Sequence, residues 1–149
     1  MHLRTKLASA ALAATIIGGG ALMPNIASAA PLNSLQSASK QAKLLAGGIN
    51  VRTTATVVCD PHDTYHPTLY VSLAQTINGT VYYGSAYRDG SNGGWVCNGK
   101  PQTLNLTVFQ SNAQPPFHKG TAVARFELWG TDSNDNWFDY SKRVTVTIN

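Results

Sequence analysis

Charge is scarce in this sequence. Charged side chains make up only 12% of the 149 residues, and Glu127 is the only glutamate. No run of lysine and arginine is present, which excludes the basic footprint typical of nucleic-acid-binding proteins. The chain also lacks a G-x-S-x-G nucleophile elbow, so it does not have the signature of an α/β-hydrolase. It has only two cysteines, Cys59 and Cys97, and in an exported protein they would form a single disulfide.

Residues 1–29 have the three parts of a secretory signal peptide. The basic start "MHLRTK" is followed by the apolar stretch "LASAALAATIIGGGALM" and by the small-residue site "ASA". The apolar stretch is short and glycine-rich for a membrane span, and no later segment approaches that length. We therefore expect cleavage after Ala29 and a bacterial protein that is secreted to the extracellular space. The mature chain would carry nine basic and seven acidic residues.

The remaining chain divides into two parts. Residues 30–48 are rich in Ala, Ser, Gln and Lys and predict a tether that is either flexible or contains a short helix. In the helical alternative, Ser39 would cap the helix and Gly47-Gly48 would end it. From Ile49 the hydrophobicity alternates with period two, the signature of half-buried strands. Residues 49–149 are therefore expected to form one β-domain.

The clearest local signal is "TLYVSLAQTI-NG-TVYYGSAYR", two β-rich runs joined by Asn78-Gly79. This dipeptide favours a type I′ turn and fixes the register of a hairpin. Ile77 should lie opposite Thr80. Outward from there, one face carries apolar core residues, and the other carries Tyr70 opposite Tyr87 and Ala74 opposite Tyr83.

About seven strands with regular turn signals predict an all-β fold, specifically an antiparallel immunoglobulin-like β-sandwich with one disulfide. The inward positions expected in its strands are Ile49, Val51, Thr53, Ala55, Val57, Cys59, Leu69, Val71, Leu73, Ile77, Gly84, Ala86, Leu104, Leu106, Val108, Ala122, Ala124, Phe126, Leu128, Val144, Val146 and Ile148. Trp95 shares a strand face with Cys97 and should pack on the disulfide. An antibody-type domain is not expected, because such a domain has a tryptophan on the strand after the first cysteine, whereas Trp95 stands two residues before the second cysteine.

The order "VVC…LYVSLAQ…WVCNG…PFHKGTAVARFELW" resembles small exported proteins of actinobacteria. The resemblance covers roughly residues 53–130, and its motifs are short and structural. It implies a single-disulfide β-sandwich in the cell envelope or medium. These proteins have no assigned activity, so the resemblance transfers no functional residue to this chain.

"CDPHDTYHP", from Cys59 to Pro67, concentrates metal-binding residue types in nine positions. His62 and His66 have the i, i+4 spacing of a helical metal site, but Pro67 disfavours helix at His66. In an extended chain the two imidazoles would lie about 13 Å apart. We expect an inter-strand loop, while a looped metal site that includes Asp63 stays open.

Two other loops have residues of functional interest. "DSNDN", with Asp132 and Asp135, resembles the start of an EF-hand loop, but Trp137 stands where that loop needs glycine. A polar hairpin turn is expected there, with a weak calcium site as the alternative. Nothing in the spacing of the Asp and His residues selects a catalytic pair, so no catalytic residue, cofactor or metal ligand is predicted.

Aromatic side chains give the one positive lead to function. Tyr70, Tyr83 and Tyr87 share the outer face of the hairpin, and Trp129 faces opposite to the inward Leu128 on its strand, with Trp137 across the next turn. Exposed aromatics on a flat sheet can anchor a protein or glycan partner, although cross-strand tyrosine pairs also stabilise sheets without any ligand.

The sequence thus favours a binding or structural role outside the cell. The alternatives are a small hydrolase or metal-dependent enzyme that uses the Asp/His loops, and an inhibitor or toxin that acts through the loop at 111–119.

Overall fold

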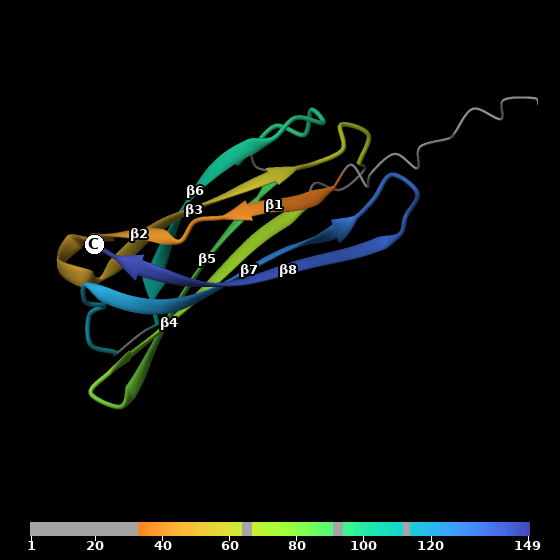
Figure 1. Cartoon of the computed structure of the whole chain (residues 1–149). Helices are drawn as coiled ribbons and strands as arrows, with labels where there is room; N and C mark the ends of the chain where they lie inside the picture. Colours follow the sequence, from red (N-terminus) through yellow and green to blue (C-terminus); the bar gives the residue numbers. More distant parts are fainter. Residues whose placement is uncertain (1–32, 64–66, 91–93, 112–113) are drawn as a thin grey trace, which may run out of the picture.

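The structure is a computed structural model of the chain, and it describes residues 33–63, 67–90, 94–111 and 114–149 (Figure 1). The described residues form β1 (Ser34–Ala38), β2 (Gln41–Leu45), the 3-10 turn η1 (Ala46–Gly48), β3 (Asn50–Val58), β4 (Thr68–Ile77), β5 (Thr80–Asp89), β6 (Gln102–Gln110), β7 (Gly120–Thr131) and β8 (Trp137–Ile148). The expected signal peptide lies outside these residues. Within them, no helix is both long and apolar enough to cross a membrane.

All eight strands belong to one hydrogen-bonded sheet. Its order is β1-β3-β2-β8-β7-β4-β5-β6, and a further pairing of β3 with β6 joins its two sides. Seven strands therefore close into a barrel, while β1 and β2 follow one another along the same edge of β3. All pairs are antiparallel except β2–β8, which is parallel. The all-β class is confirmed, but the strands form one closed, mixed sheet rather than the two antiparallel sheets of an immunoglobulin-like sandwich.

A barrel and a sandwich have the same local sequence pattern, and this is why the expected sandwich was wrong. In both architectures each strand alternates between an inner apolar and an outer polar face. What separates them is the long-range partner of each strand. Here β3 pairs with β6 over eight residue pairs, from Asn50 opposite Phe109 to Val57 opposite Gln102. Nothing in the alternation of either strand specifies that partner.

The segment predicted to be a tether contributes two strands. β1 and β2 pair with β3, and β2 also pairs with β8, so the β-domain begins well before Ile49. Ser39 caps no helix. Its hydroxyl instead accepts a hydrogen bond from the Gln41 amide and donates one to the Gln41 carbonyl, where the chain bends between β1 and β2. Gly47 and Gly48 adopt positive φ in η1, which turns the chain into β3.

The β4–β5 hairpin forms as predicted. Ile77 lies opposite Thr80, Tyr70 opposite Tyr87 and Ala74 opposite Tyr83. Asn78 and Gly79 both have positive φ, as a type I′ turn requires. The tip of this hairpin projects beyond the rest of the barrel (Figure 1).

The predicted inward positions fill the barrel. Buried core residues include Val51, Val57, Leu69, Val71, Leu73, Leu104, Leu106, Val108, Ala122, Ala124, Phe126, Leu128, Val146 and Ile148, while Val144 is half-buried. Trp95 is buried in the same cluster as Cys59, and Cys97 packs against that cluster. Ile49 is an exception to the expected pattern. It is 57% exposed, because it follows η1 in an αR conformation and precedes the first residue of β3.

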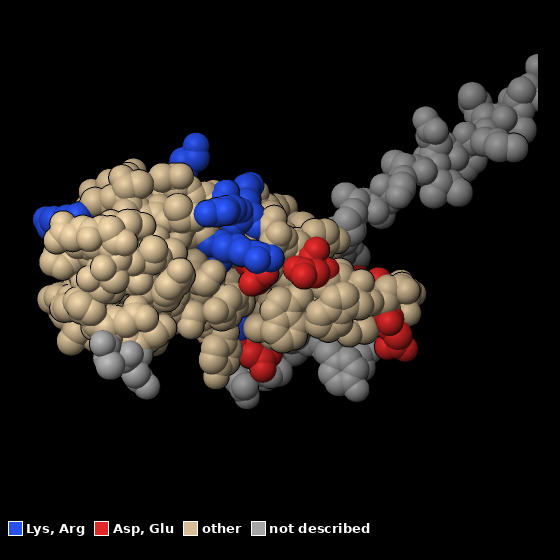
Figure 2. All heavy atoms as spheres, turned by 90° about the horizontal axis from the view of Figure 1, so that it is seen from below, with Lys and Arg blue, Asp and Glu red and all other residues tan. Residues whose placement is uncertain are grey.

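The barrel has two chemically different ends. The disulfide end, as we call it, consists of the β3–β4, β5–β6 and β7–β8 connections, and six of the seven acidic residues of the chain lie in or beside them: Asp60, Asp63, Asp89, Asp132, Asp135 and Asp139. The opposite end holds the β4–β5 turn, η1 and the loop before β7. Figure 2 shows the acidic side chains gathered toward one end and the basic ones toward the middle and the other end.

Candidate functional site

Four aromatic residues lie on the outer faces of the neighbouring strands β5, β4 and β7 and at the start of β8. We call Tyr70, Tyr87, Trp129 and Trp137 the aromatic face. Tyr87 lies opposite Tyr70 on the β4–β5 hairpin. Trp129 on β7 lies opposite Thr68, which is two residues before Tyr70 on β4 and therefore on the same face. The Trp129 and Trp137 rings stack with centroids 5.7 Å apart and planes 25° apart.

The aromatic face is open to solvent. Tyr87 is 74% exposed, Trp137 65% and Trp129 37%, while Tyr70 is half-buried between its neighbours. Aromatic rings of this size are normally packed away from water, so several together on one surface indicate a binding role more strongly than single exposed residues do. The outward orientation follows from the register that Asn78-Gly79 sets and from the alternation along β7.

Charged groups border the aromatic face. Glu127 lies opposite Tyr70, and Asp139 lies opposite Trp129. Glu127 forms an ion pair with Arg125 at 2.7 Å, with the Arg125 side chain 56% exposed. Carboxylate acceptors and guanidinium donors therefore stand beside the rings, where they can reach hydroxyl groups of a ligand that lies flat on them.

Tyr83 lies on the same outer surface but borders a separate hollow of about 190 Å³. Arg125 and Arg143 also line it, and they lie directly opposite each other on β7 and β8. Like charges at opposed positions repel, and only Arg125 has its ion pair with Glu127. This arginine pair could not be predicted from the sequence, because it depends on the register of a β7–β8 connection that has no two-residue turn signal.

The disulfide predicted between Cys59 and Cys97 is present, with an S–S distance of 2.07 Å and Cα atoms 4.9 Å apart. The Gly99 amide donates a hydrogen bond to the Cys59 carbonyl beside it. Together these contacts fix the β5–β6 connection to the end of β3. The role of Cys59 is therefore structural.

The acid-rich loop after Cys59 is organised around Asn33 and Asp60. The Asp60 amide donates to the Asn33 side-chain oxygen, and the Asp60 carboxylate accepts from the His62 amide. Asp63 is only 9% exposed, and burial raises the pKa of its carboxyl group, with the nearby Asp60 and Asp132 charges adding to the effect. His66 lies outside the described residues, so the structure does not place the His62–His66 pair.

The "DSNDN" segment forms a polar turn between β7 and β8. The Asp132 carboxylate accepts hydrogen bonds from the Asn134 and Asn136 amides, and the bond from Asn136 is the main cause of the lowered pKa of Asp132. Asp132 therefore satisfies backbone groups of its own turn. Across the described ranges, no three His, Cys, Asp or Glu side chains come together as a metal site.

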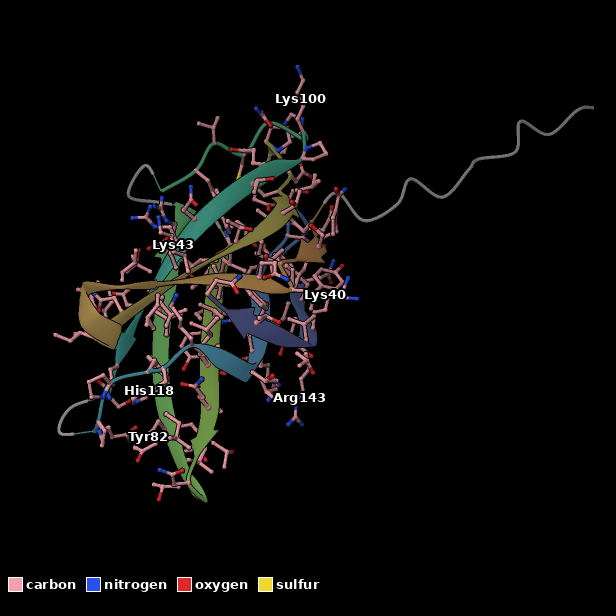
Figure 3. All side chains as sticks on the ribbon, turned by 60° about the vertical axis from the view of Figure 1, so that its left-hand side comes forward. Lys40, Lys43, Tyr82, Lys100, His118 and Arg143 are labelled. Carbon is pink, nitrogen blue, oxygen red and sulfur yellow. A yellow bond between two sulfur atoms is a disulfide. The ribbon has the colours of Figure 1, made fainter. Side chains whose placement is uncertain are left out.

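The described part of the loop at 111–119 is held to the barrel. Phe117 is 1% exposed, and the buried Gln75 side chain donates to the His118 carbonyl and accepts from the His118 amide. The Tyr83 amide donates to the Gln114 side chain. Figure 3 shows His118 and Tyr82 at the end of the molecule away from Lys100. Residues 114–118 are thus anchored rather than presented on a free loop.

Comparisons with known protein families, with curated proteins and with solved structures find no match for this chain.

Proposed function

We propose that the protein is an exported carbohydrate-binding domain whose ligand lies on the aromatic face. The observation that carries the proposal is the pair of stacked, exposed tryptophans, Trp129 and Trp137, on the same outer surface as Tyr70 and Tyr87. Pyranose rings present flat C–H surfaces that pack against indole and phenol rings. Their hydroxyl groups need polar partners at the edge of such a platform.

The polar surroundings support a sugar rather than a purely apolar partner. Glu127 lies directly opposite Tyr70, and Asp139 lies directly opposite Trp129. Arg125 forms an ion pair with Glu127. A protein partner with a dry hydrophobic core would leave these charges desolvated, at a cost of several kcal/mol for each unpaired charge. Sugar hydroxyl groups can hydrogen-bond them and leave them partly hydrated.

The signal-like N-terminal sequence and the resemblance to exported actinobacterial proteins support a location outside the cell, where polysaccharides are abundant. The disulfide is compatible with that location, since cysteine pairs persist in oxidising compartments. A surface or secreted β-domain without a catalytic pair fits a role in attachment to cell-wall or extracellular glycans.

The test is retention of the protein on a panel of insoluble cell-wall material and polysaccharides. We expect Trp137→Ala combined with Tyr87→Ala to weaken retention at least about tenfold, or about 1.4 kcal/mol. Both side chains are largely exposed, so the free energy of unfolding should fall only by what the Trp129–Trp137 stack and the Tyr70–Tyr87 pair contribute, at most about 1.5 kcal/mol for each substitution. Trp137→Phe should restore part of the binding, because a phenyl ring keeps a stacking surface.

Ile49→Ala is the matched control. It removes an exposed apolar side chain at the opposite end of the barrel and should leave retention unchanged. Equal retention of the wild type and the double variant on every material that binds would contradict the proposal. So would a large loss of stability in the double variant, because the rings would then be structural.

A further inference from the structure

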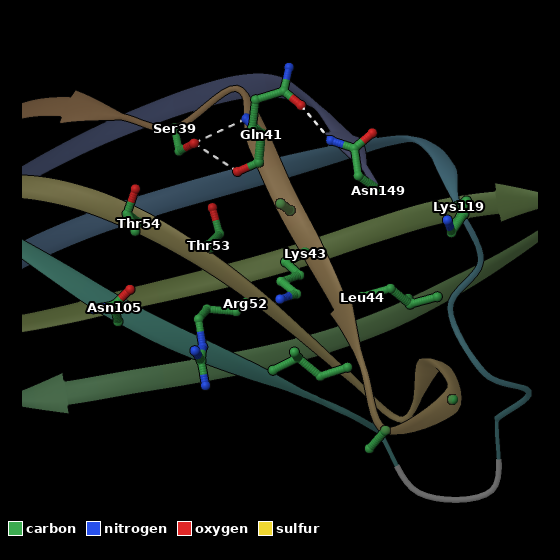
Figure 4. Close-up of a pocket in the computed structure, with 14 residues that line it drawn as sticks. Ser39, Gln41, Lys43, Leu44, Arg52, Thr53, Thr54, Asn105, Lys119 and Asn149 are labelled. Atoms are coloured by element: carbon green, nitrogen blue, oxygen red, sulfur yellow. Dashed lines mark hydrogen bonds between the residues drawn. The ribbon is translucent and has the colours of Figure 1, made fainter.

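A wide hollow lies on the other side of the barrel from the aromatic face. It is a groove of about 760 Å³, open to solvent, that runs along β2 and the adjacent part of β3 toward the start of β7 (Figure 4). The groove forms where the chain bends between β1 and β2. One edge of β3 therefore pairs with two short strands instead of one long strand. Its volume is within the range of small-molecule sites, about 300–1,000 Å³.

All the charged side chains that line the groove are basic. Lys43 and Arg52 lie directly opposite each other on β2 and β3, and Lys119 stands at the far end before β7. Figure 4 shows the Lys43 and Arg52 side chains in the same region of the groove. Opposed like charges destabilise a strand pair, and an anion bound between them removes that repulsion.

Among the described residues, no acidic side chain lines the groove. Six of the seven acidic residues lie at the disulfide end, and the seventh, Glu127, is paired with Arg125 on the aromatic side. The side chains of the groove therefore contribute a local excess of positive charge, which favours an anion.

A buried hydroxyl adds a specific polar group to the groove. Thr53 lines it and is only 2% exposed, and its Oγ1 atom has no hydrogen-bond partner among the described residues. A buried hydroxyl without a partner costs about 1–3 kcal/mol. A ligand atom that accepts or donates a hydrogen bond there would recover that loss.

The rest of the lining is mainly apolar. Ala42, Leu44 and Leu45 of β2 contribute aliphatic surface next to the basic residues. A small inorganic anion would leave this surface wet, whereas each methylene group buried against it contributes up to about 0.8 kcal/mol. The groove therefore combines the two features that an amphipathic anion needs.

We propose that this groove binds an anionic amphiphile, a single hydrocarbon chain that ends in a carboxylate or phosphate. The anionic group lies between Lys43 and Arg52, and the chain lies along Leu44 toward Lys119. This site is separate from the aromatic face, and the proposal does not depend on carbohydrate binding.

Isothermal titration of the full chain with three probes tests the proposal. Decanoate has both the chain and the charge, decanol has only the chain, and acetate has only the charge. We expect decanoate to bind at least about tenfold more tightly than either of the others, and its affinity to fall as salt is raised. Equal binding of decanol would show a purely apolar groove, and equal binding of acetate a simple anion site; either result overturns the proposal.

Variants locate the site. Lys43→Gln combined with Arg52→Gln should weaken decanoate binding about tenfold, with two ion pairs contributing up to about 1 kcal/mol each. Lys100→Gln removes a positive charge at the disulfide end and is the control (Figure 3). Both variants should keep the thermal transition of the wild type, which is checked by circular dichroism. Equal decanoate affinity in the double variant and in the control would overturn the assignment.

Lipid vesicles distinguish a free anionic amphiphile in solution from the anionic headgroups of a membrane as the source of the bound charge. With the same protein, vesicles of phosphatidylglycerol are compared with vesicles of phosphatidylcholine. A groove that takes one chain from solution should bind free decanoate in the absence of any bilayer. Binding to phosphatidylglycerol vesicles without any binding of free decanoate would show only surface attraction to an anionic membrane, and it would contradict the proposed groove.

Discussion

Asp63 is a buried carboxyl group whose pKa is raised by its surroundings. It lies at the disulfide end, 9% exposed, and its carboxylate oxygens find no hydrogen-bond partner of normal geometry among the described residues. Burial raises the pKa above the ordinary 3.8, and the charges of Asp60 and Asp132 raise it further, while the Asn33 side chain opposes them. The folded protein therefore holds this proton more tightly than the unfolded chain does.

A pH dependence of stability follows from that raised pKa. The stability contributed by neutral Asp63 is fully present below the unfolded-state pKa, and it is lost as the pH rises through the folded-state pKa. We expect Asp63→Asn, which stays neutral, to be more stable than the wild type near pH 7, with the difference shrinking toward pH 3. Urea unfolding from pH 3 to 8 measures it. Asp139→Asn, an exposed carboxylate on β8, is the control, and an Asp63→Asn curve parallel to the wild type at every pH would refute the expectation.

At the scale of the strands, the direct pairing between β5 and β6 is short. Only Gly84 opposite Gln110 and Ser85 opposite Phe109 are paired there. A Cβ atom on Gly84 would meet the Phe109 carbonyl oxygen at 2.6 Å, the Val108 side chain at 2.9 Å and the Phe117 ring at 3.0 Å. Glycine thus lets the two strands and the Phe117 ring come together.

Gly84→Ala should consequently destabilise the fold by about 1–3 kcal/mol, the usual range for overpacking a well-filled interior. Its neighbour Ser85 faces solvent, so Ser85→Ala should stay within about 0.5 kcal/mol of the wild type. The stabilities of the two variants are compared by their midpoints of urea unfolding. If Gly84→Ala were as stable as Ser85→Ala, the close approach of β5 and β6 would not require glycine at position 84.

Local signals account for the strands that the sequence predicted well. Asn78-Gly79 and the flanking alternation determine both the register of the β4–β5 hairpin and which tyrosines point outward. β1 and β2 were not predicted, because Ala, Ser, Gln and Lys have little intrinsic preference for strands. They are strands because β3 and β8 offer backbone partners to them. The β3 partner of β1 and the β8 partner of β2 are distant in sequence, and the turn that joins β2 to β3 is η1 rather than a two-residue hairpin turn, so no local pattern indicates these pairings.

The same reasoning separates the two candidate sites. The outward orientation of the aromatic face was predictable from alternation, but the stacking of Trp129 on Trp137 requires the β7–β8 register, which places Trp137 opposite Thr131. The basic groove was not predictable at all. It depends on pairing Lys43 with Arg52 across η1, in a segment whose composition indicated a tether.

At the scale of the whole molecule, the disulfide joins the end of β3 to the connection between β5 and β6. Cys59 follows β3 directly, and Cys97 lies in that long connection, at a sequence separation of 38. β5 and β6 themselves share only two residue pairs. The disulfide therefore restrains the β5–β6 connection at the end of the barrel where β5 and β6 are not paired with each other.

Replacing both cysteines, Cys59→Ala with Cys97→Ala, should lower the free energy of unfolding by about 4 kcal/mol, because closing a loop of this length removes that much conformational entropy from the unfolded chain. Many single domains have a total stability of about 5–15 kcal/mol, so the variant would retain only part of its margin. Thermal unfolding of the wild type, with and without dithiothreitol, provides the comparison. The reduced wild type should unfold near the temperature of the double variant, and the double variant should not respond to dithiothreitol. A double variant as stable as the oxidised wild type would mean that strand pairing alone holds the β5–β6 connection in place.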